Sequence, residues 1–244
     1  MHEFTGRNRE SYLRVLEHFG IRRNDSTFEQ LKECALNLQA DMSDKAVAHW
    51  HDTIAHNLIK PGESVLDLGC GDGELLSILS KDHRCWVQGI ESDEAKVNQC
   101  IERCVPVCHG DLAEVMRLLP DNSYDWTVLE NTLQTLQDPL RTLEEMLRIS
   151  HHSIVSFPNF AHWSVRFTFS LGGRMPVTRS LPYTWYNTPN IHLCSITDFL
   201  DWVAKADVRI VDAWVLVEGQ IVPFSRDSDQ NITGEQALFV IERK

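Results

Sequence analysis

The segment Val65–Gly73 restricts this chain more than any other, because an apolar run leads directly into Gly69, Gly71 and Gly73. The apolar run, Ser64–Leu68, predicts a short buried strand, and the sequence after the third glycine predicts a helix. Gly69 and Gly71 allow the backbone to turn sharply and to approach a ligand with no Cβ in the way, and Gly73 allows close contact where the helix begins. A strand, a glycine turn and a helix in this order predict the first unit of an α/β fold, with a ligand at the turn.

Strands and helices alternate beyond this first unit. Further strands are predicted at Trp86–Ile90, Val105–Cys108, Tyr124–Leu129 and Ser153–Phe157. The helices between the strands are predicted to begin near Glu74, Asp93 and Asp138. Asp93 suits the N-cap of a helix, and so does Asp138, which is followed by Pro139. This alternation predicts a parallel sheet with helices on both faces, the doubly wound, Rossmann-like α/β class.

The pattern changes after Phe157. Residues 158–192 are rich in aromatic residues, proline and glycine and have no clean period, so they predict an insertion that acts as a lid or binds a partner. A helix capped by Ser195 or Thr197 follows. The segments Val208–Val217 and Ala237–Ile241 then predict two last strands as an antiparallel pair, which gives an expected sheet of seven strands.

Residues 1–57 precede the first strand and predict an N-terminal helical extension, and residues 58–244 make up the main domain. Apolar residues recur at helical spacing within the extension, at Leu31, Cys34, Ala35 and Leu38. The sequence leaves two interpretations open: the extension packs on the domain, or it is an arm that binds a partner.

Acidic residues follow the predicted strands at the edge where the glycine turn lies. Asp67 lies near the end of the first strand, Glu91 lies 20 residues after Gly71, and Asp111 lies 20 residues after Glu91. An acid at Glu91 can accept hydrogen bonds from both hydroxyls of a ribose, and Asp111 can accept one from an adenine amino group. Glu74 takes the place of the last glycine of a dinucleotide loop, where its charge would repel a pyrophosphate. A ligand with a sulfonium and an ammonium tolerates that charge.

These features together resemble the class I methyltransferases that depend on S-adenosylmethionine (SAM). More narrowly, Val155–Phe160, the pair His162 and Trp163, and Asn190–Leu193 resemble the MetW family of methionine biosynthesis, over roughly residues 58–200. The resemblance implies a methyltransferase-like domain that binds SAM or its product S-adenosylhomocysteine and acts with a MetX-like homoserine O-acyltransferase. The ligand-binding residues expected from the glycine turn, the strand ends and this resemblance are Asp67, Gly69, Cys70, Gly71, Gly73, Glu91, Ser92, Asp111, Leu112 and Glu130.

Two functions fit this interpretation. In the first, the chain is a SAM-dependent methyltransferase, and hence a transferase, that acts on a small molecule. In the second, it supports or regulates the acyltransferase without methyl chemistry, and SAM acts as an effector through different affinities for two states.

Catalytic residues are not fixed by the sequence, because methyl transfer depends on proximity and in-line approach more than on an acid–base pair. The candidates are Asn131, Arg174 and His192. Arg174 can pair with a substrate carboxylate, and His192 is either a general base or a hydrogen-bonded structural histidine. Further side chains noted in the same regions are Gln134, His162, Arg166, Tyr183 and Tyr186.

Aromatic residues of the insertion suggest either a protein interface or core packing. A patch that exposes Trp163, Phe167, Trp185 and Tyr186 would be unusually apolar for the surface of a monomer. Such a patch, with arginines among the aromatics, is typical of the residues that dominate a protein–protein interface.

The net charge of −12 disfavours nucleic acid and anionic membranes as partners. The basic residues are most concentrated around Arg166, Arg174 and Arg179, and even there they are sparse. No stretch approaches the roughly 18 apolar residues of a membrane helix. These observations predict a cytoplasmic protein.

The seven cysteines are expected to be reduced thiols. A four-residue spacing followed by a histidine suggests a metal site, at Cys100, Cys104, Cys108 and His109. Pro106 interrupts any helix that would place the three sulfurs on one face, so no metal is expected.

Overall fold

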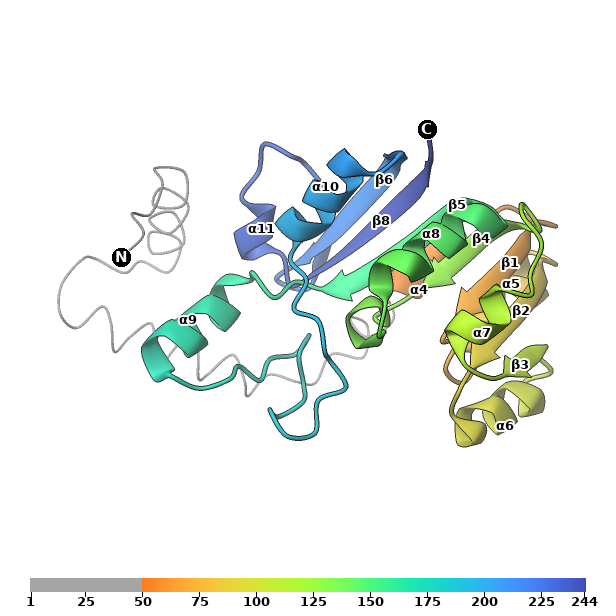
Figure 1. Cartoon of the computed structure of the whole chain (residues 1–244), viewed down its shortest axis with the longest axis horizontal. Helices are drawn as coiled ribbons and strands as arrows, with labels where there is room; N and C mark the ends of the chain where they lie inside the picture. The colour runs from red at the N-terminus through yellow and green to blue at the C-terminus, as the bar shows by residue number, and fades with distance from the viewer. Residues whose placement is uncertain (1–49) are drawn as a thin grey trace.

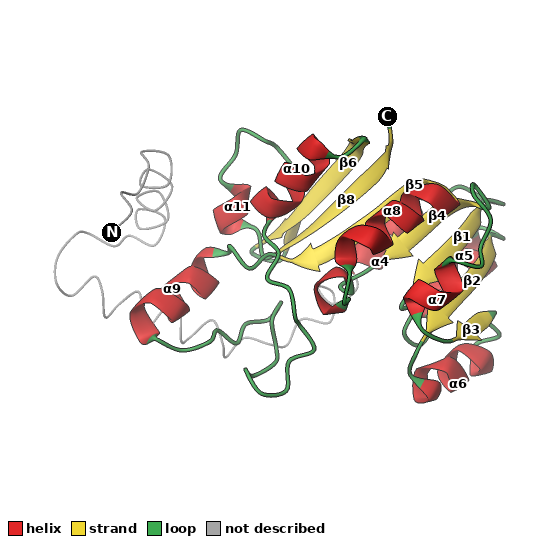
Figure 2. Ribbon diagram, in the orientation of Figure 1, coloured by secondary structure: helices red, strands yellow, loops and turns green. Residues whose placement is uncertain are grey.

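A computed structural model describes residues 50–244, without the side chains of residues 171 and 172, and contains one twisted sheet of eight strands (Figures 1 and 2). The strands, in chain order, are β1 (Ser64–Leu68), β2 (Trp86–Glu91), β3 (Val107–His109), β4 (Tyr124–Leu129), β5 (Ser150–Pro158), β6 (Val208–Val217), β7 (Gln220–Pro223) and β8 (Gln236–Arg243). They lie side by side in the order β3-β2-β1-β4-β5-β8-β6-β7.

The first five strands are parallel, and β1 lies between β2 and β4. Leu66 pairs with Gln88 on one side and with Thr127 on the other. The strand order therefore reverses direction at β1 and β4, and the carboxyl ends of these two strands open the crevice in which doubly wound sheets bind their ligands. The glycine turn Gly69–Gly73 follows β1 at this point, as the sequence predicts.

The last strands confirm one prediction and correct another. Strand β8 lies between β5 and β6 and is antiparallel to both, as predicted for the C-terminal pair. The predicted number of seven strands is wrong, because β7 adds an eighth strand through a hairpin with β6. This strand is only four residues long and ends at Pro223, so neither its length nor its composition indicated a strand.

The helices lie on both faces of the sheet. They are α4 (Trp50–Leu58), α5 (Glu74–Asp82), α6 (Glu94–Glu102), α7 (Leu112–Met116), the 3₁₀ turn η1 (Leu133–Thr135), α8 (Pro139–Ile149), α9 (Trp163–Gly172), α10 (Ile196–Lys205) and α11 (Gln230–Thr233). Helices α7, α8 and α10 cover one face of the sheet, and α4, α5 and α6 cover the other. Helix α9 extends away from the sheet (Figure 1).

Two apolar clusters, one on each face, hold these layers together. Leu66 and Leu68 of β1 face α8. Val65, which precedes Leu66 on the strand, faces α4 and α5 on the other side of the sheet. This alternation follows from the period of two in a strand. Full burial of such side chains contributes about 1.5–3 kcal/mol each, so the sheet is stabilised from both faces.

The predicted helix starts are confirmed by capping hydrogen bonds. The Asp93 side chain accepts from the Ala95 N–H, and the Asp138 side chain accepts from the Arg141 N–H. Ser195 begins α10 with a reciprocal capping box in which Asp198 is the second member. These caps use atoms within three residues of each other, which is why the local sequence is enough to predict them.

The N-terminal extension lies largely outside the described residues, including its pattern from Leu31 to Leu38. The boundary expected between residues 57 and 58 falls within α4. Trp50, in the first turn of α4, is buried, and its Nε1 donates to Gln236 Oε1 at 2.8 Å. At least this last part of residues 1–57 therefore packs on the sheet domain.

Candidate functional site

The glycines between β1 and α5 all have a positive φ: 77° at Gly69, 59° at Gly71 and 74° at Gly73. Such angles strain any residue that has a Cβ. A Cβ at Gly71 would meet no atom within 4 Å, whereas a Cβ at Gly73 would lie 3.0 Å from Cys100 Sγ. Gly71 therefore faces the open side of the turn, where a ligand can lie against the backbone, and Gly73 packs against the protein.

Cys70 supports the same turn from its inner side. The N–H groups of Gly69 and Cys70 both donate to the Ile90 carbonyl, at 2.8 and 3.2 Å. Cys70 Sγ lies 3.8 Å from Cys100 Sγ, which donates to the Gly71 carbonyl at 3.2 Å. Burial raises the pKa of the Cys70 and Cys100 thiols above their usual range, so both sulfurs stay protonated.

Glu91, at the end of β2, is fixed by backbone hydrogen bonds. Its Oε2 accepts from the Gly71 N–H at 3.0 Å, and its Oε1 accepts from the N–H groups of Ser92 and Asp93 at 2.8 and 2.9 Å. The side chain is only 6% exposed. A carboxylate held in this way is rigid and still has lone pairs for hydroxyl donors. The expected contact with a ribose stays a prediction.

Asp52, Asp67 and Glu130 bring three carboxyl groups together beside the turn, and we call them the acid cluster. Asp67 lies near the end of β1, Glu130 directly follows β4, and Asp52 lies in the first turn of α4. The carboxyl groups of Glu130 and Asp52 are hydrogen bonded to each other. Asp67 is 5% exposed.

The acid cluster binds protons more tightly than exposed carboxyl groups do. Burial, reinforced by the charges of Asp52 and Glu91, raises the pKa of Asp67 to about 8. Burial, reinforced by the charges of Asp52 and Asp67, raises the pKa of Glu130 well above its ordinary value. Burial disfavours the charged form of these carboxyl groups. A cationic group placed here would offset that effect, favour the ionised carboxylates and so release protons.

The segment after β4 connects the acid cluster to the insertion. Gln134 Nε2 donates to the Asn131 carbonyl at 2.6 Å. The main-chain carbonyl of Gln134 accepts hydrogen bonds from the main-chain N–H groups of Ile191 and His192, at 2.9 and 3.0 Å. Two candidate catalytic residues, Asn131 and His192, are therefore brought to the same segment.

Unsatisfied polar atoms mark this region. Within the described part of the chain, Glu130 Oε1, Gln134 Oε1 and His192 Nε2 are buried and have no hydrogen-bond partner. Buried polar groups are normally paired, so these atoms are candidates for contacts with a ligand or with water. A cavity of about 260 Å³ lies next to Gln134 and His192, with Leu143 of α8 and Phe199 of α10 in its wall.

Asp111 has a role that the sequence did not predict. Its Oδ1 accepts from the N–H groups of Ala113 and Glu114, at 2.9 and 3.2 Å, and so caps the short helix α7. Leu112 packs against the apolar cluster on the same face. The other oxygen of Asp111 is not used by the cap, and its expected contact with an adenine amino group stays a prediction.

Arg174 is exposed in the loop that follows α9 and does not line the cavity next to Gln134 and His192. His162 caps α9, and its Nδ1 lies 2.7 Å from Ser164 Oγ. Burial, followed by the charge of Arg166, lowers the pKa of His162 to about 4, so its ring is neutral. These facts favour a structural role for His162.

The expected aromatic patch is divided by the structure. Trp163 is 6% exposed and packs with Ile232 and Phe167, so of the two alternatives, interface or core packing, the structure favours core packing for this residue. Trp185 and Tyr186 are 75% and 71% exposed, as a surface patch requires. The sequence did not separate these alternatives for Trp163, because it did not predict α9 or the inner face of that helix.

Two residues of the site region were not found from the sequence. Asp52 was missed because an acid in the first turn of a helix is ordinarily a solvated residue. Asn159, 1% exposed, was noted only as part of a sequence run. Its Nδ2 donates to the carbonyls of Asn231 and Gly234, and its Oδ1 accepts from the Ile196 N–H, so it joins the ends of β5, α10 and α11. No local pattern indicates partners so far apart in the chain.

Two other kinds of site, a metal centre and a membrane-spanning helix, are absent from residues 50–244. In this range no three His, Cys, Asp or Glu side chains are arranged to hold a metal ion. The helices described there are all too short or too polar to cross a membrane.

A comparison with family models supplies an independent assignment. The model described as "Methionine biosynthesis protein MetW" matches residues 50–241. A curated relative from Rhodopirellula baltica, named "Bifunctional methionine biosynthesis protein MetXA/MetW", is 31% identical over 198 residues, which is 77% of this chain. The match spans only 32% of that relative's length, so the relative is a much longer protein.

Solved structures agree with the fold. A SAM-dependent methyltransferase from Thermotoga maritima, described as a possible histamine N-methyltransferase, gives a TM-score of 0.57 at 17% identity over 81% of this chain and 90% of its own. The [4+2]-cyclase SpnF gives a TM-score of 0.55 at 16% identity over 80% of each chain. At these identities the likeness shows a methyltransferase-type fold and no particular activity.

Proposed function

This chain belongs to the MetW family of methionine biosynthesis, and from that premise we propose that it binds SAM in the cytoplasm and regulates a homoserine O-acyltransferase. The proposal has two parts, a ligand and a partner. Each part rests on a separate observation, and each can fail without the other.

The proposal that the ligand is SAM rests on one observation, the acid cluster beside Gly71, whose backbone is open to a ligand. SAM has a sulfonium and an ammonium, and Asp67 and Glu130 offer carboxyl groups at the carboxyl ends of β1 and β4. Gly71 leaves room for the ligand against the backbone, and Glu91 is rigid enough to accept from ribose hydroxyls. The same acids oppose a pyrophosphate, which supports SAM over a dinucleotide.

The acid cluster also favours SAM over S-adenosylhomocysteine. The two ligands differ by the sulfonium charge and one methyl group. Carboxylates in a buried site interact more strongly with a positive charge than carboxylates in water do. A regulator with this selectivity responds to SAM itself and is little affected by the demethylated product.

The partner is supported by the relative whose printed name joins MetXA and MetW in one protein. Because that relative carries both parts in one chain, we infer that the part represented by this chain acts together with an acyltransferase. A SAM-bound state and a SAM-free state with different affinities for the acyltransferase would then couple an end product of the pathway to its early step.

The second candidate is a SAM-dependent methyltransferase that acts on a small molecule. The unpartnered Gln134 Oε1 and His192 Nε2, next to a cavity of about 260 Å³, favour it, because they can bind a polar acceptor. Asn131 lies in the same segment, whereas Arg174 lies apart from it on the insertion.

Three measurements on the full chain test these proposals. A thermal melt should show stabilisation of about 2.7 kcal/mol by SAM at 100 times its dissociation constant, and less by S-adenosylhomocysteine at the same concentration. Co-purification with the acyltransferase tests the partner. Formation of S-adenosylhomocysteine in the presence of cytosolic small molecules tests the methyltransferase. No stabilisation by either ligand would exclude both candidates, and turnover without a complex would select the second.

A further inference from the structure

Exposed apolar side chains are concentrated on the insertion. Of the thirteen large apolar side chains that are exposed within residues 50–244, seven lie between positions 169 and 193. We call them the insertion surface: Phe169, Met175, Tyr183, Trp185, Tyr186, Ile191 and Leu193. Exposed apolar side chains are normally scattered singly over a soluble protein, so this concentration in one segment indicates a binding surface.

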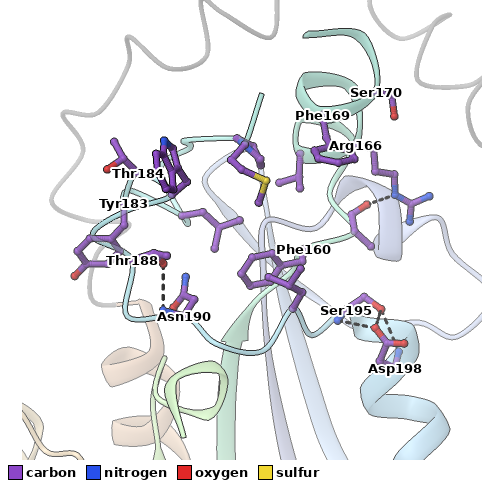
Figure 3. A pocket seen from close by; sticks show the side chains of 17 residues that line it. Phe160, Arg166, Phe169, Ser170, Tyr183, Thr184, Thr188, Asn190, Ser195 and Asp198 are labelled. Carbon is purple, nitrogen blue, oxygen red and sulfur yellow. Dashed lines mark hydrogen bonds between the residues drawn. The ribbon is translucent and has the colours of Figure 1, made fainter. Parts of the chain in front are cut away.

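A cavity of about 620 Å³ lies within the insertion surface (Figure 3). Phe169 of α9 and Tyr183 of the following loop lie on opposite sides of it, and Phe160, next to the end of β5, lies between them. Trp185 and Leu193 also line it and are 75% and 63% exposed, so its wall continues into the outer surface. Because the wall continues into the outer surface, a side chain of another macromolecule can enter the cavity while the backbone of that macromolecule stays outside.

The charge of the insertion differs from that of the whole chain. Between Glu145 and Asp198 the sequence contains no aspartate, glutamate or lysine, although the whole chain has a net charge of −12. Depletion of these three residue types, with enrichment in aromatics, methionine and arginine, is the composition of interface cores. Arg166 lines the cavity and Arg174 is exposed nearby, after the end of α9.

One acidic residue lies at the margin of the cavity. Asp198 lines the cavity, but its Oδ2 accepts from both the N–H and the hydroxyl of Ser195 in the capping box of α10. Asp198 keeps its negative charge, so Arg166 and Arg174 together exceed it by one positive charge on this face of an otherwise acidic protein.

We infer that the insertion surface docks a segment of the homoserine O-acyltransferase in which an apolar side chain, flanked by carboxylates, enters the cavity. The inference rests on the proposed function and names its contact surface and the chemistry of the partner segment. A phosphate-rich partner fits less well, because recognition of nucleic acid or of anionic lipid relies on many basic residues and the net charge of −12 opposes both.

Two hydrogen bonds, one to the main chain and one from the side chain of Gln134, connect this surface to the proposed SAM site. Ile191 belongs to the insertion surface, and its N–H donates to the Gln134 carbonyl at 2.9 Å. Gln134 in turn donates to the Asn131 carbonyl, next to Glu130 of the acid cluster. A change in the position of Glu130 on SAM binding can therefore reach the docking surface through two hydrogen bonds.

Site-specific cross-linking identifies the occupant. A photoreactive phenylalanine analogue at Tyr186 of the full chain should form a covalent adduct with the acyltransferase, and mass spectrometry should place it in a peptide that contains apolar and acidic residues. The same analogue at Trp86, which is 78% exposed on β2, is the matched control and should give no adduct. Adducts with residues 1–49 of the same chain, or with a second copy, would overturn the inference.

Affinity measurements test the energetics of the same surface. Trp185→Ala should weaken the complex at least 30-fold, and Arg174→Glu about 10-fold, because aromatic and arginine side chains dominate interface energies. Trp86→Ala and Arg117→Glu, at exposed positions outside the insertion, should leave the affinity unchanged. All four variants should bind SAM as tightly as the unmodified chain does.

The outcomes separate the inference from the proposed function. If the unmodified chain binds the acyltransferase and Trp185→Ala and Arg174→Glu bind it equally well, the docking surface is elsewhere and the proposed partnership stands. If the unmodified chain binds SAM and no acyltransferase, the partnership itself is wrong and the docking inference fails with it.

Discussion

The acid cluster and the insertion surface differ in almost every physical property, although two backbone hydrogen bonds to Gln134 connect their neighbourhoods. In the acid cluster Asp67 is buried and Asp52 and Glu130 are half-buried, and the adjacent Glu91 is held by three backbone N–H groups. The insertion surface is exposed, aromatic and free of acids from Glu145 to Asp198. The contrast shows a preorganised site suited to a small cationic ligand next to a surface suited to a large partner.

The largest expected effect separates the two regions through a pair of matched glycines. Gly71 and Gly173 have the same φ of 59°, and a Cβ at either position would meet no atom within 4 Å. Gly71→Val should lower the affinity for SAM by at least about 1,000-fold, roughly 4 kcal/mol, because the branched side chain fills the ligand space. Gly173→Val introduces a similar backbone strain of about 1–2 kcal/mol and should leave SAM affinity unchanged. An equal loss of SAM affinity in both variants, measured by calorimetry, would mean that backbone strain alone lowers the affinity.

The next effect divides the insertion itself into a buried and an exposed part. Trp163→Ala removes a side chain packed against Ile232 and Phe167 and should lower the free energy of unfolding by about 3 kcal/mol. Trp185→Ala, at 75% exposure, should change it by less than about 0.5 kcal/mol. Urea denaturation of the two variants measures both values. A stable Trp163→Ala protein would return Trp163 to the surface.

A smaller effect is expected from the carboxylate at the end of β2. Glu91→Ala should reduce SAM affinity about 10- to 100-fold, because it removes an acceptor for the ribose hydroxyls worth about 1.5–3 kcal/mol. It also removes the partner of the Gly71, Ser92 and Asp93 N–H groups, so a lower melting temperature should accompany the loss. Glu94→Ala, on the exposed side of α6, should affect neither measurement. Indistinguishable results from the two variants would argue against Glu91 as a ligand residue.

The smallest effect is the pH dependence of the acid cluster. The pKa of Asp67 is raised from 3.8 to about 8 in the folded chain, so with rising pH the unfolded carboxyl group ionises first. Asp67 therefore lowers stability progressively between about pH 4 and pH 8, and no further above that. SAM, as a cation, favours the ionised form, so its affinity should rise with pH by at most about tenfold per unit below pH 8.

Asp67→Asn tests this pH dependence, with Asp125→Asn as its opposite. Asp67→Asn should stabilise the ligand-free chain at pH 8 and weaken SAM binding several-fold. Hydrogen bonds from Ser64 lower the pKa of Asp125, so its ionised form stabilises the fold at neutral pH and this contribution is lost in acid. Asp125→Asn should therefore lower the melting temperature at pH 7. Stability profiles of the same sign for both variants would contradict the assignment.

Local patterns predicted the parts of the molecule that depend on neighbouring residues. The turn at Gly69–Gly73 and the caps at Asp93, Asp138 and Ser195 follow from backbone geometry and hydrogen bonds within a few positions. Regular alternation of strands and helices likewise predicted the sheet up to β5.

Contacts between distant segments were not predictable in the same way. Asp52 acts on Glu130 across 78 positions, and only the fold brings these carboxyl groups together. Helix α9 was missed because only part of one side of it packs, through Trp163 and Phe167, so it has no continuous apolar stripe. Strand β7 exists because β6 offers it an edge, and its own four residues gave no strand signal.

The attachment of the insertion at Gln134 has a consequence for how this protein can diverge. The two hydrogen bonds there are donated by the main-chain N–H groups of Ile191 and His192. Every residue except proline carries such a group. The exposed side chains of the insertion surface can therefore change with the partner, while these two hydrogen bonds to the segment after β4 are kept. A proline at position 191 or 192 would remove one of these two hydrogen bonds, because proline has no main-chain N–H.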